Sequence, residues 1–176
     1  HARVRHAGKP IKLIIPPNCY GGTNDQARRC AAMAEDVEVV DLPVDAGKEM
    51  TDSLEKVLSE VALQDAVSII LVEIPTNPRV EVPAMALLGE VLRKTHRTNT
   101  GAAAIPPIFI VDQTFCPNVR LLHDQSTLVN VQTLSFSSGS KFPSGGRCTA
   151  GYVTANKKAE PLLSFIRIHL QLCDNL

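Results

Sequence analysis

The sequence predicts an α/β fold of three layers, in which a mostly parallel sheet is covered by helices on both faces. Short runs of about four to eight residues are apolar on both sides, which is typical of parallel strands buried between two layers of helices. Segments with helical periodicity lie between these runs, and such alternation indicates crossover connections within one sheet. With 176 residues, the chain has about the length of one domain, for which roughly 150 residues is the usual scale.

Six apolar runs are predicted to form the strands. The clearest are AVSIILVE at 66–73 and PIFIVD at 107–112, because their apolar residues are almost continuous. The run at 149–154 is the weakest, since it contains glycine and threonine. In chain order, the predicted strands are 11–15, 37–40, 66–73, 107–112, 131–136 and 149–154.

The clearest predicted helix is 52–64, where apolar residues recur at the spacing i, i+3, i+4 and i+7. Asp52 followed by Glu55 predicts a capping box at its first turn. The residues of the apolar stripe are Leu54, Val57, Leu58 and Val61.

Three further helices are predicted between or after the strands. One begins at Pro83, because a proline in the first turn has no N–H to leave unsatisfied. Another, at 24–34, is expected to turn small residues toward the sheet, and the last covers 159–172. The small residues are Ala27, Cys30, Ala31 and Ala34.

Composition excludes several classes of function. Lys plus Arg and Asp plus Glu each number 18, and this neutral balance argues against nucleic acid or an anionic membrane as partner. The apolar runs are too short to span a bilayer, and the five histidines show no metal-ligand spacing, so no metal is expected. The five cysteines form no CxxC pair, which predicts reduced thiols in an intracellular, cytoplasmic protein.

Polar side chains follow four of the predicted strands. Tyr20, Asn77, Asp112 and Lys141 each lie at or just beyond the end of a different apolar run. Ligands of open parallel sheets bind outside the carboxyl ends of the strands. Each residue taken alone also fits an ordinary turn or cap, but together the four predict one binding site.

The residue types at these strand ends suit one cofactor chemistry. A lysine just after a buried strand can be partly desolvated, which favours the neutral amine needed to form an imine. Asp112 could pair with a protonated ring nitrogen, and a lysine imine with such an aspartate is how proteins handle pyridoxal phosphate. Asn77 could reach the ring hydroxyl, and Tyr20 could stack on the ring. The hydroxyls of Ser138 and Ser140 could bind the phosphate.

Four stretches of the sequence, in order, resemble the pyridoxal-phosphate enzymes of cysteine and methionine metabolism. This family includes the cystathionine gamma-synthases and lyases and the homoserine sulfhydrylases, of fold type I. The resemblance covers roughly residues 10–155. The four stretches are YGGT at 20–23, EIPTNP at 73–78, VDQTF at 111–115 and SGSKF at 138–142, the last followed by a Gly-Gly pair at 145–146.

The resemblance implies a role for each matching residue. Lys141 would hold the cofactor as an imine and move protons, and Tyr20 would stack on the ring and join in proton transfer. The residues implied in cofactor binding are Tyr20, Asn77, Asp112, Thr114, Ser138, Ser140 and Lys141. The sequence departs from the family pattern at Gln113, Ser137, Ser140 and Phe142, where the family commonly has Asn, His, Thr and Tyr.

The implied function is a lyase or transferase of transsulfuration, acting by elimination or replacement at the β or γ carbon of a sulfur amino acid. The chain would be the central part of the large domain, without the N-terminal phosphate loop and the C-terminal substrate domain. The intact parent would be a homotetramer built as a dimer of dimers. Two alternatives stay open: a degenerate, non-catalytic homologue that serves as an assembly subunit, and a fold type I aminotransferase.

Overall fold

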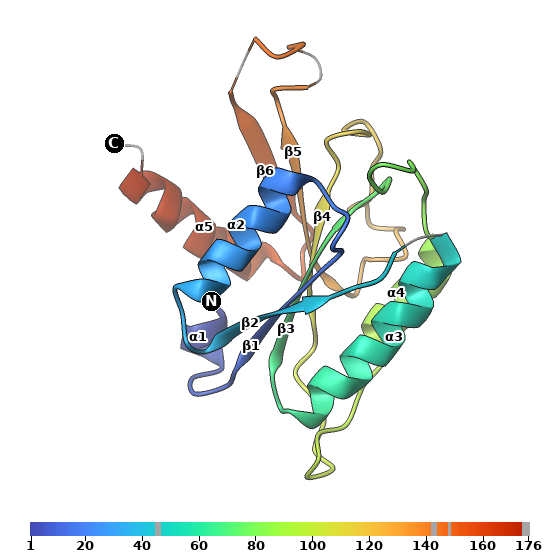
Figure 1. Ribbon diagram of the computed structural model, residues 1–176, viewed down its shortest axis with the longest axis vertical. Coiled ribbons are helices and arrows are strands. Elements are labelled where there is room, and N and C mark those ends of the chain that lie inside the picture. The colour runs from blue at the N-terminus through green and yellow to red at the C-terminus, as the bar shows by residue number, and fades with distance from the viewer. Residues whose placement is uncertain (45–46, 142–143, 148, 174–176) are drawn as a thin grey trace.

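A computed structural model describes residues 1–44, 47–141, 144–147 and 149–173 (Figure 1). Within these residues the chain forms six strands and five helices. The strands are β1 (Ile11–Ile15), β2 (Val37–Asp41), β3 (Val67–Glu73), β4 (Ile108–Asp112), β5 (Gln132–Ser138) and β6 (Gly151–Ala155). The helices are α1 (Ala2–Arg5), α2 (Gly21–Ala32), α3 (Gly47–Leu63), α4 (Met85–Arg93) and α5 (Glu160–Cys173).

The strands form one sheet in the order β2-β1-β3-β4-β5-β6, in which β6 alone is antiparallel to its neighbour. From β1 the chain moves outward to β2, and from β2 it returns past β1 to β3. The strand order therefore reverses at β1 and β3. Such a switch point opens a crevice at the carboxyl ends of the strands, where ligands of open α/β sheets bind.

Helices cover both faces of the sheet, so the predicted three-layer α/β fold is confirmed. Figure 1 shows α3 and α4 on one face and α1, α2 and α5 on the other. The central strands supply fully buried side chains such as Ile14, Ile70 and Phe109, which pack in one cluster with the predicted apolar stripe of α3. Each such side chain contributes about 1.5–3 kcal/mol on burial.

Three predicted helix starts are wrong. α3 begins at Gly47, so Asp52 lies inside the helix and no capping box forms there. The extra turn buries Met50 in the core, which outweighs a local capping signal. α4 begins at Met85 with Ala84 as its N-cap residue, two residues later than predicted. α2 begins at Gly21, earlier than the predicted start at residue 24.

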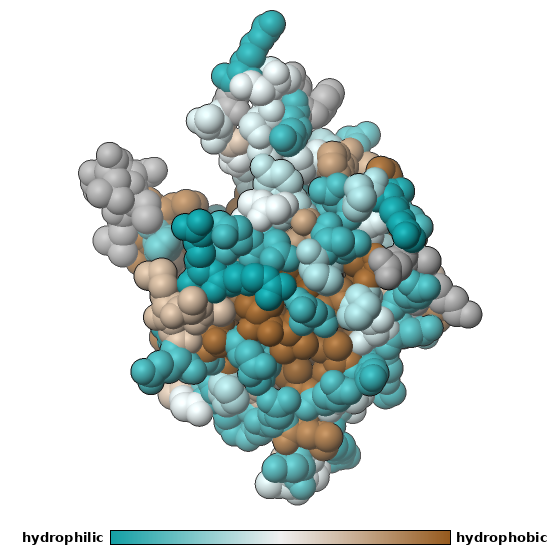
Figure 2. Space-filling view, viewed as in Figure 1, coloured by the Kyte–Doolittle hydropathy of each residue, from teal (hydrophilic) through white to brown (hydrophobic). Residues whose placement is uncertain are grey.

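The prediction that small residues of α2 face the sheet is confirmed in part, since Ala27 and Ala31, and Ala34 just after the helix, are half-buried. None of its residues is fully buried, and Cys30 is exposed. α2 packs on β1 and β2, and β2 is the edge of the sheet, so its inner side is only half covered. Figure 2 shows polar surface over α2 and an apolar area between α2 and α3, where β2 lies.

The cysteine side chains that the structure describes agree with the prediction of reduced thiols. Cys19, Cys30 and Cys116 are free, while Cys148 and the side chain of Cys173 lie outside the described part. No helix in the described part of the chain has the length and apolar character needed to cross a membrane.

Candidate active site

A cavity of about 130 Å³ opens at the carboxyl ends of the parallel strands, beside the switch point. All seven predicted cofactor-binding residues line it: Tyr20, Asn77, Asp112, Thr114, Ser138, Ser140 and Lys141. Four further residues complete the lining, namely Thr23, Glu73, Phe115 and Phe136. The structure thus brings together residues that follow four different strands. Their roles toward a cofactor stay predictions.

Asp112 is the last residue of β4 and lies buried at the floor of the cavity. Its Oδ1 accepts the backbone N–H of Thr114 at 2.8 Å, which closes a tight turn after the strand. Thr114 Oγ1 in turn accepts the backbone N–H of Ser138 at 3.0 Å. These two bonds lock the end of β4 to the end of β5, so Asp112 is held by the sheet itself.

Gln113, one of the departures from the family pattern, turns away from the cavity into a buried network. Its Oε1 accepts the Ser135 hydroxyl at 2.5 Å. Its Nε2 donates to the carbonyls of Val119 at 2.8 Å and Cys116 at 3.3 Å. A longer amide than asparagine therefore ties β5 to the segment that follows β4. Gln113 supports the cavity wall from behind and does not line it.

Two serines form a polar end of the cavity after β5. Ser138 Oγ and Ser140 Oγ lie 2.7 Å apart, and the Ser140 N–H donates to Ser138 Oγ. Between them, Gly139 passes so close to the neighbouring strand that a Cβ there would lie 2.7 Å from the carbonyl oxygen of Ala150. Only glycine fits that approach, so Gly139 brings the two hydroxyls together on one side.

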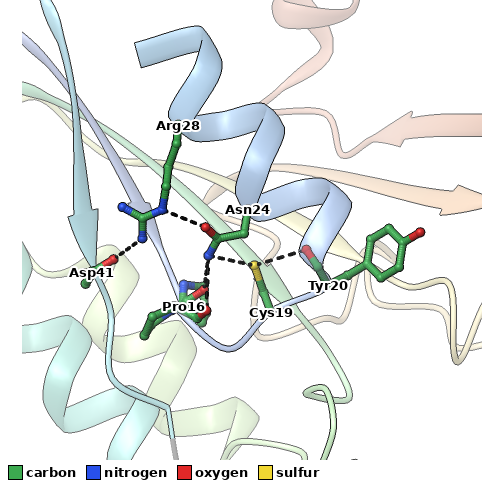
Figure 3. A network of polar contacts seen from close by, with 7 residues as sticks. Pro16, Cys19, Tyr20, Asn24, Arg28 and Asp41 are labelled. Atoms are coloured by element: carbon green, nitrogen blue, oxygen red, sulfur yellow. Dashed lines mark hydrogen bonds and ion pairs between the residues drawn. The ribbon is translucent and has the colours of Figure 1, made fainter. Parts of the chain in front are cut away.

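Tyr20 is positioned by the loop between β1 and α2, which Figure 3 shows from close by. Asn24 Nδ2 donates to the carbonyls of Pro16 at 3.2 Å and Pro17 at 3.3 Å. Arg28 holds Asn24 from the next turn, through Nε to Oδ1 at 2.7 Å, and also contacts Asp41 on β2. The two bonds from Asn24 thus fix the loop that carries Tyr20 against the start of α2, while the Arg28–Asp41 ion pair lies on the surface.

Lys141 lies at the rim of the cavity with its Nζ 5.8 Å from the centre of the Tyr20 ring. This is the range of a cation–π contact, and it places two predicted catalytic side chains, Tyr20 and Lys141, against each other. Lys141 is exposed, so the expectation that its amine is partly desolvated is wrong. The strand ends at Ser138, and the two residues that follow carry Lys141 out to the surface. Phe142, another departure from the family, lies outside the described residues.

Glu73 lines the cavity, although no role was predicted for it from the sequence. It is the last residue of β3, in register with Asp112 on β4, and its side chain is buried. Its Oε1 accepts the backbone N–H of Tyr20 at 2.7 Å, and the backbone N–H of Asn77 also interacts with the carboxyl group. Burial, and to a lesser degree the negative charge of Asp112, raise the pKa of Glu73. One sequence signal could have identified Glu73 as a site residue. It is a carboxylate at the end of an apolar run, the same pattern that identified Asp112.

The raised pKa of Glu73 predicts a fall in stability with rising pH. Between the pKa of glutamate in the unfolded chain, about 4.3, and the higher folded pKa, the folded chain binds more protons than the unfolded chain. The free energy of unfolding therefore decreases as pH rises through this window and stays lower above it. Glu73→Gln has no carboxyl group to titrate at this position. The free energy of unfolding of the variant should therefore increase relative to that of the parent as pH rises. Urea unfolding at several pH values measures the difference, and parallel curves for the two chains would contradict the prediction.

A larger cavity of about 540 Å³ lies at the opposite edge of the sheet, near the start of β3 and β5. Its lining includes His96, Lys94 and Lys158, and none of the predicted cofactor-binding residues. Burial lowers the pKa of His96. Amino ends of parallel strands are not where ligands of this fold class bind, so the smaller cavity is the candidate active site.

Comparison with solved structures places the fold. A cystathionine gamma lyase from Micromonospora echinospora matches with a TM-score of 0.65 at 18% identity, over 99% of this chain and 40% of the lyase. A cystathionine gamma synthase from Xanthomonas oryzae pv. oryzae, solved with cystathionine, matches with a TM-score of 0.57 at 20% identity, over 85% of this chain and 33% of the synthase. No family model and no curated protein matches the sequence.

The chain spans about 40% of the length of the lyase and about a third of the synthase. The shared part includes the sheet whose carboxyl edge carries the cavity, since nearly the whole chain superposes on the lyase. At identities near 20% the likeness concerns the arrangement of the backbone. The chain therefore has the α/β fold of this lyase and this synthase, in agreement with the fold that the sequence resemblance implied.

Proposed function

We propose that this chain is the cofactor-binding part of a pyridoxal-phosphate enzyme that makes or breaks C–S bonds in sulfur amino acids. One observation carries the proposal. Seven residues that the sequence assigned to this cofactor, spread over residues 20–141, line a single cavity at the carboxyl edge of the sheet. An arrangement of lysine, aspartate, stacking aromatic and paired hydroxyls suits pyridoxal phosphate better than any other common cofactor.

The side chains that line the cavity have the chemistry that pyridoxal phosphate requires. The cofactor, when bound, supplies an aldehyde and an electron-withdrawing ring. Lys141, whose exposed amine lines the rim of the cavity, would hold the cofactor there. Asp112, held in place by the Thr114 N–H, offers its other carboxylate oxygen to a protonated ring nitrogen. The Ser138 and Ser140 hydroxyls donate to phosphate oxygens.

The Tyr20 ring and Asn77 would complete the binding of the cofactor ring. Tyr20 offers an aromatic face toward Lys141, where it stacks on a planar ligand. Asn77 has an amide that can donate to a ring hydroxyl from the β3 side of the cavity. Lys141 and Tyr20 are the two groups placed to move a proton to or from a substrate carbon.

The whole protein would extend beyond this chain, which covers 40% of the lyase it resembles in structure. We infer that residues 1–176 are the central part of the large domain, with the phosphate loop and the substrate domain supplied by flanking segments. The substrate would be a small sulfur amino acid, used in the cytoplasm by a dimer of dimers, with either lyase or transferase chemistry at the β or γ carbon.

Titration of the purified chain with pyridoxal phosphate tests the proposal. Formation of the C=N bond changes the visible absorption of the cofactor, and reduction with borohydride makes the attachment permanent. Digestion and mass spectrometry should then find the mass of the reduced cofactor on the peptide that contains Lys141. Absence of any attachment, both in this chain and in the longer protein that contains it, would favour the degenerate, non-catalytic homologue instead.

A further inference from the structure

Glu73 lies at the meeting point of two walls of the cavity. One wall is the loop from β1 to α2, which carries Tyr20, and the other is the segment after β3, which carries Asn77. The backbone N–H of Tyr20 donates to the Glu73 carboxyl group, and the backbone N–H of Asn77, in the second wall, interacts with the same group. The contact with Tyr20 is made across 53 positions of the sequence.

The Tyr20 N–H depends on this contact. Tyr20 is the N-cap residue of α2, so its N–H precedes the helix and has no acceptor within it. Glu73 Oε1 supplies that acceptor at 2.7 Å. The other oxygen of the carboxyl group, Oε2, is buried and has no hydrogen-bond partner within the described protein.

Gly22 leaves room for the ring of Tyr20, which is half exposed. A Cβ on Gly22 would lie 2.8 Å from Cε1 of the ring, so the ring folds back over the bare first turn of α2. Glu73 anchors the backbone of Tyr20, and the absence of a side chain at position 22 lets the ring lie over the start of α2. From that place it faces the Lys141 amine.

We propose that Glu73 is a positioning residue, whose carboxyl oxygen fixes Tyr20 and the Asn77 segment at the distance that a planar ring requires between them. The significance of this role rests on the proposed function, but the contact itself can be measured without any ligand. Because the contact requires only an acceptor oxygen at the place of Glu73 Oε1, an uncharged side chain with the same oxygen should perform the role. Glu73→Gln keeps that oxygen, whereas Glu73→Leu keeps only the approximate shape.

The first experiment follows the Tyr20 N–H itself. Hydrogen exchange measured by NMR on the whole chain should find this amide about tenfold or more slower than an unprotected amide, in the parent and in Glu73→Gln. The protection should be lost in Glu73→Leu. Exchange of the Tyr20 N–H at the unprotected rate in the parent would overturn the proposal. So would equal loss in both variants, which would mean that the charge, and not the acceptor, matters.

The second experiment follows the ring. The chain has two tyrosines and no tryptophan, so in a Tyr152→Phe background the fluorescence comes from Tyr20 alone. Quenching by acrylamide should increase toward that of free tyrosine in Glu73→Leu and stay at the parent value in Glu73→Gln. Thr76→Val is the matched control, since Thr76 is buried in the same segment but its hydroxyl accepts the N–H of Glu81 and not that of Tyr20. Unchanged quenching in a folded Glu73→Leu chain would overturn the proposal.

The experiments distinguish a failure of the positioning role from a misfolded variant and from a failure of the proposed function. If Glu73→Leu fails to fold, as circular dichroism would report, the exchange rates of the parent and of Glu73→Gln still decide the question. If the parent binds no pyridoxal phosphate, the proposed function fails, while the Tyr20 measurements stand on their own. Where the cofactor does bind, Glu73→Leu should weaken its affinity about tenfold, and an unchanged affinity would overturn the positioning role.

Discussion

Replacing Lys141 with alanine should abolish the covalent attachment of pyridoxal phosphate. Attachment requires a primary amine at the cavity rim, and Lys141 is the lysine that lines the cavity among the described residues. Alanine removes the amine without changing a buried contact, because the lysine side chain is exposed. Borohydride reduction followed by intact-mass measurement should therefore show full labelling of the parent and none of Lys141→Ala.

A lysine elsewhere provides the control for this experiment. Lys157 is exposed and contacts Asp124 on the surface, away from the cavity. Lys157→Ala should be labelled as fully as the parent. Labelling of Lys141→Ala at the parent level would show that the cofactor reacts with lysines at random, and the assignment of Lys141 would be wrong.

Replacing Asp112 with asparagine should weaken the binding of pyridoxal phosphate by roughly 10- to 150-fold. A hydrogen bond to a charged group is worth about 1.5–3 kcal/mol, and 1.4 kcal/mol is a factor of ten in affinity. Asparagine keeps the oxygen that accepts the Thr114 N–H, so the turn after β4 is retained. Only the negative charge opposite the ring nitrogen is lost. Equilibrium titration, followed by the visible absorption of the cofactor, gives the two dissociation constants.

Asp41 is a matched control for Asp112, because each is the last residue of a parallel strand. Asp41 lies at the end of the edge strand β2 and pairs with Arg28 on the surface, and it does not line the cavity. Asp41→Asn should leave the cofactor affinity unchanged. If Asp112→Asn binds as tightly as the parent, the carboxylate does not face the ring nitrogen.

The candidate site could largely be predicted from the sequence, because its residues sit at the ends of recognisable strands. Asp112 ends an unbroken apolar run, and the carboxyl ends of parallel strands meet at one edge of the sheet. Glu73 ends a similar run, but its contact is with the backbone of Tyr20, 53 positions away. Sequence periodicity contains no information about which loop crosses above a strand end, so this role could not be predicted.

The errors have a common physical origin in tertiary packing. The capping signal at Asp52 is local, whereas the observed start of α3 at Gly47 buries Met50 in the shared core. The exposure of Lys141 also depends on tertiary structure. A residue shortly after a buried strand is buried only if other segments cover it, and Lys141, three residues after the end of β5, is left exposed.

The sequence by itself determined the layered α/β fold and the six strands, because apolar runs are local patterns. The polar residues that end these runs, together with the resemblance to a known family, predicted the seven residues that line the cavity. The tertiary structure alone decided how the strands are ordered, with the reversal at β1 that opens the crevice. It also decided that Gln113 supports the wall from behind and that Glu73 joins Tyr20 to Asn77. Contacts of this kind join segments that are far apart in the sequence. Where these segments meet is decided by the burial of apolar surface over the whole chain.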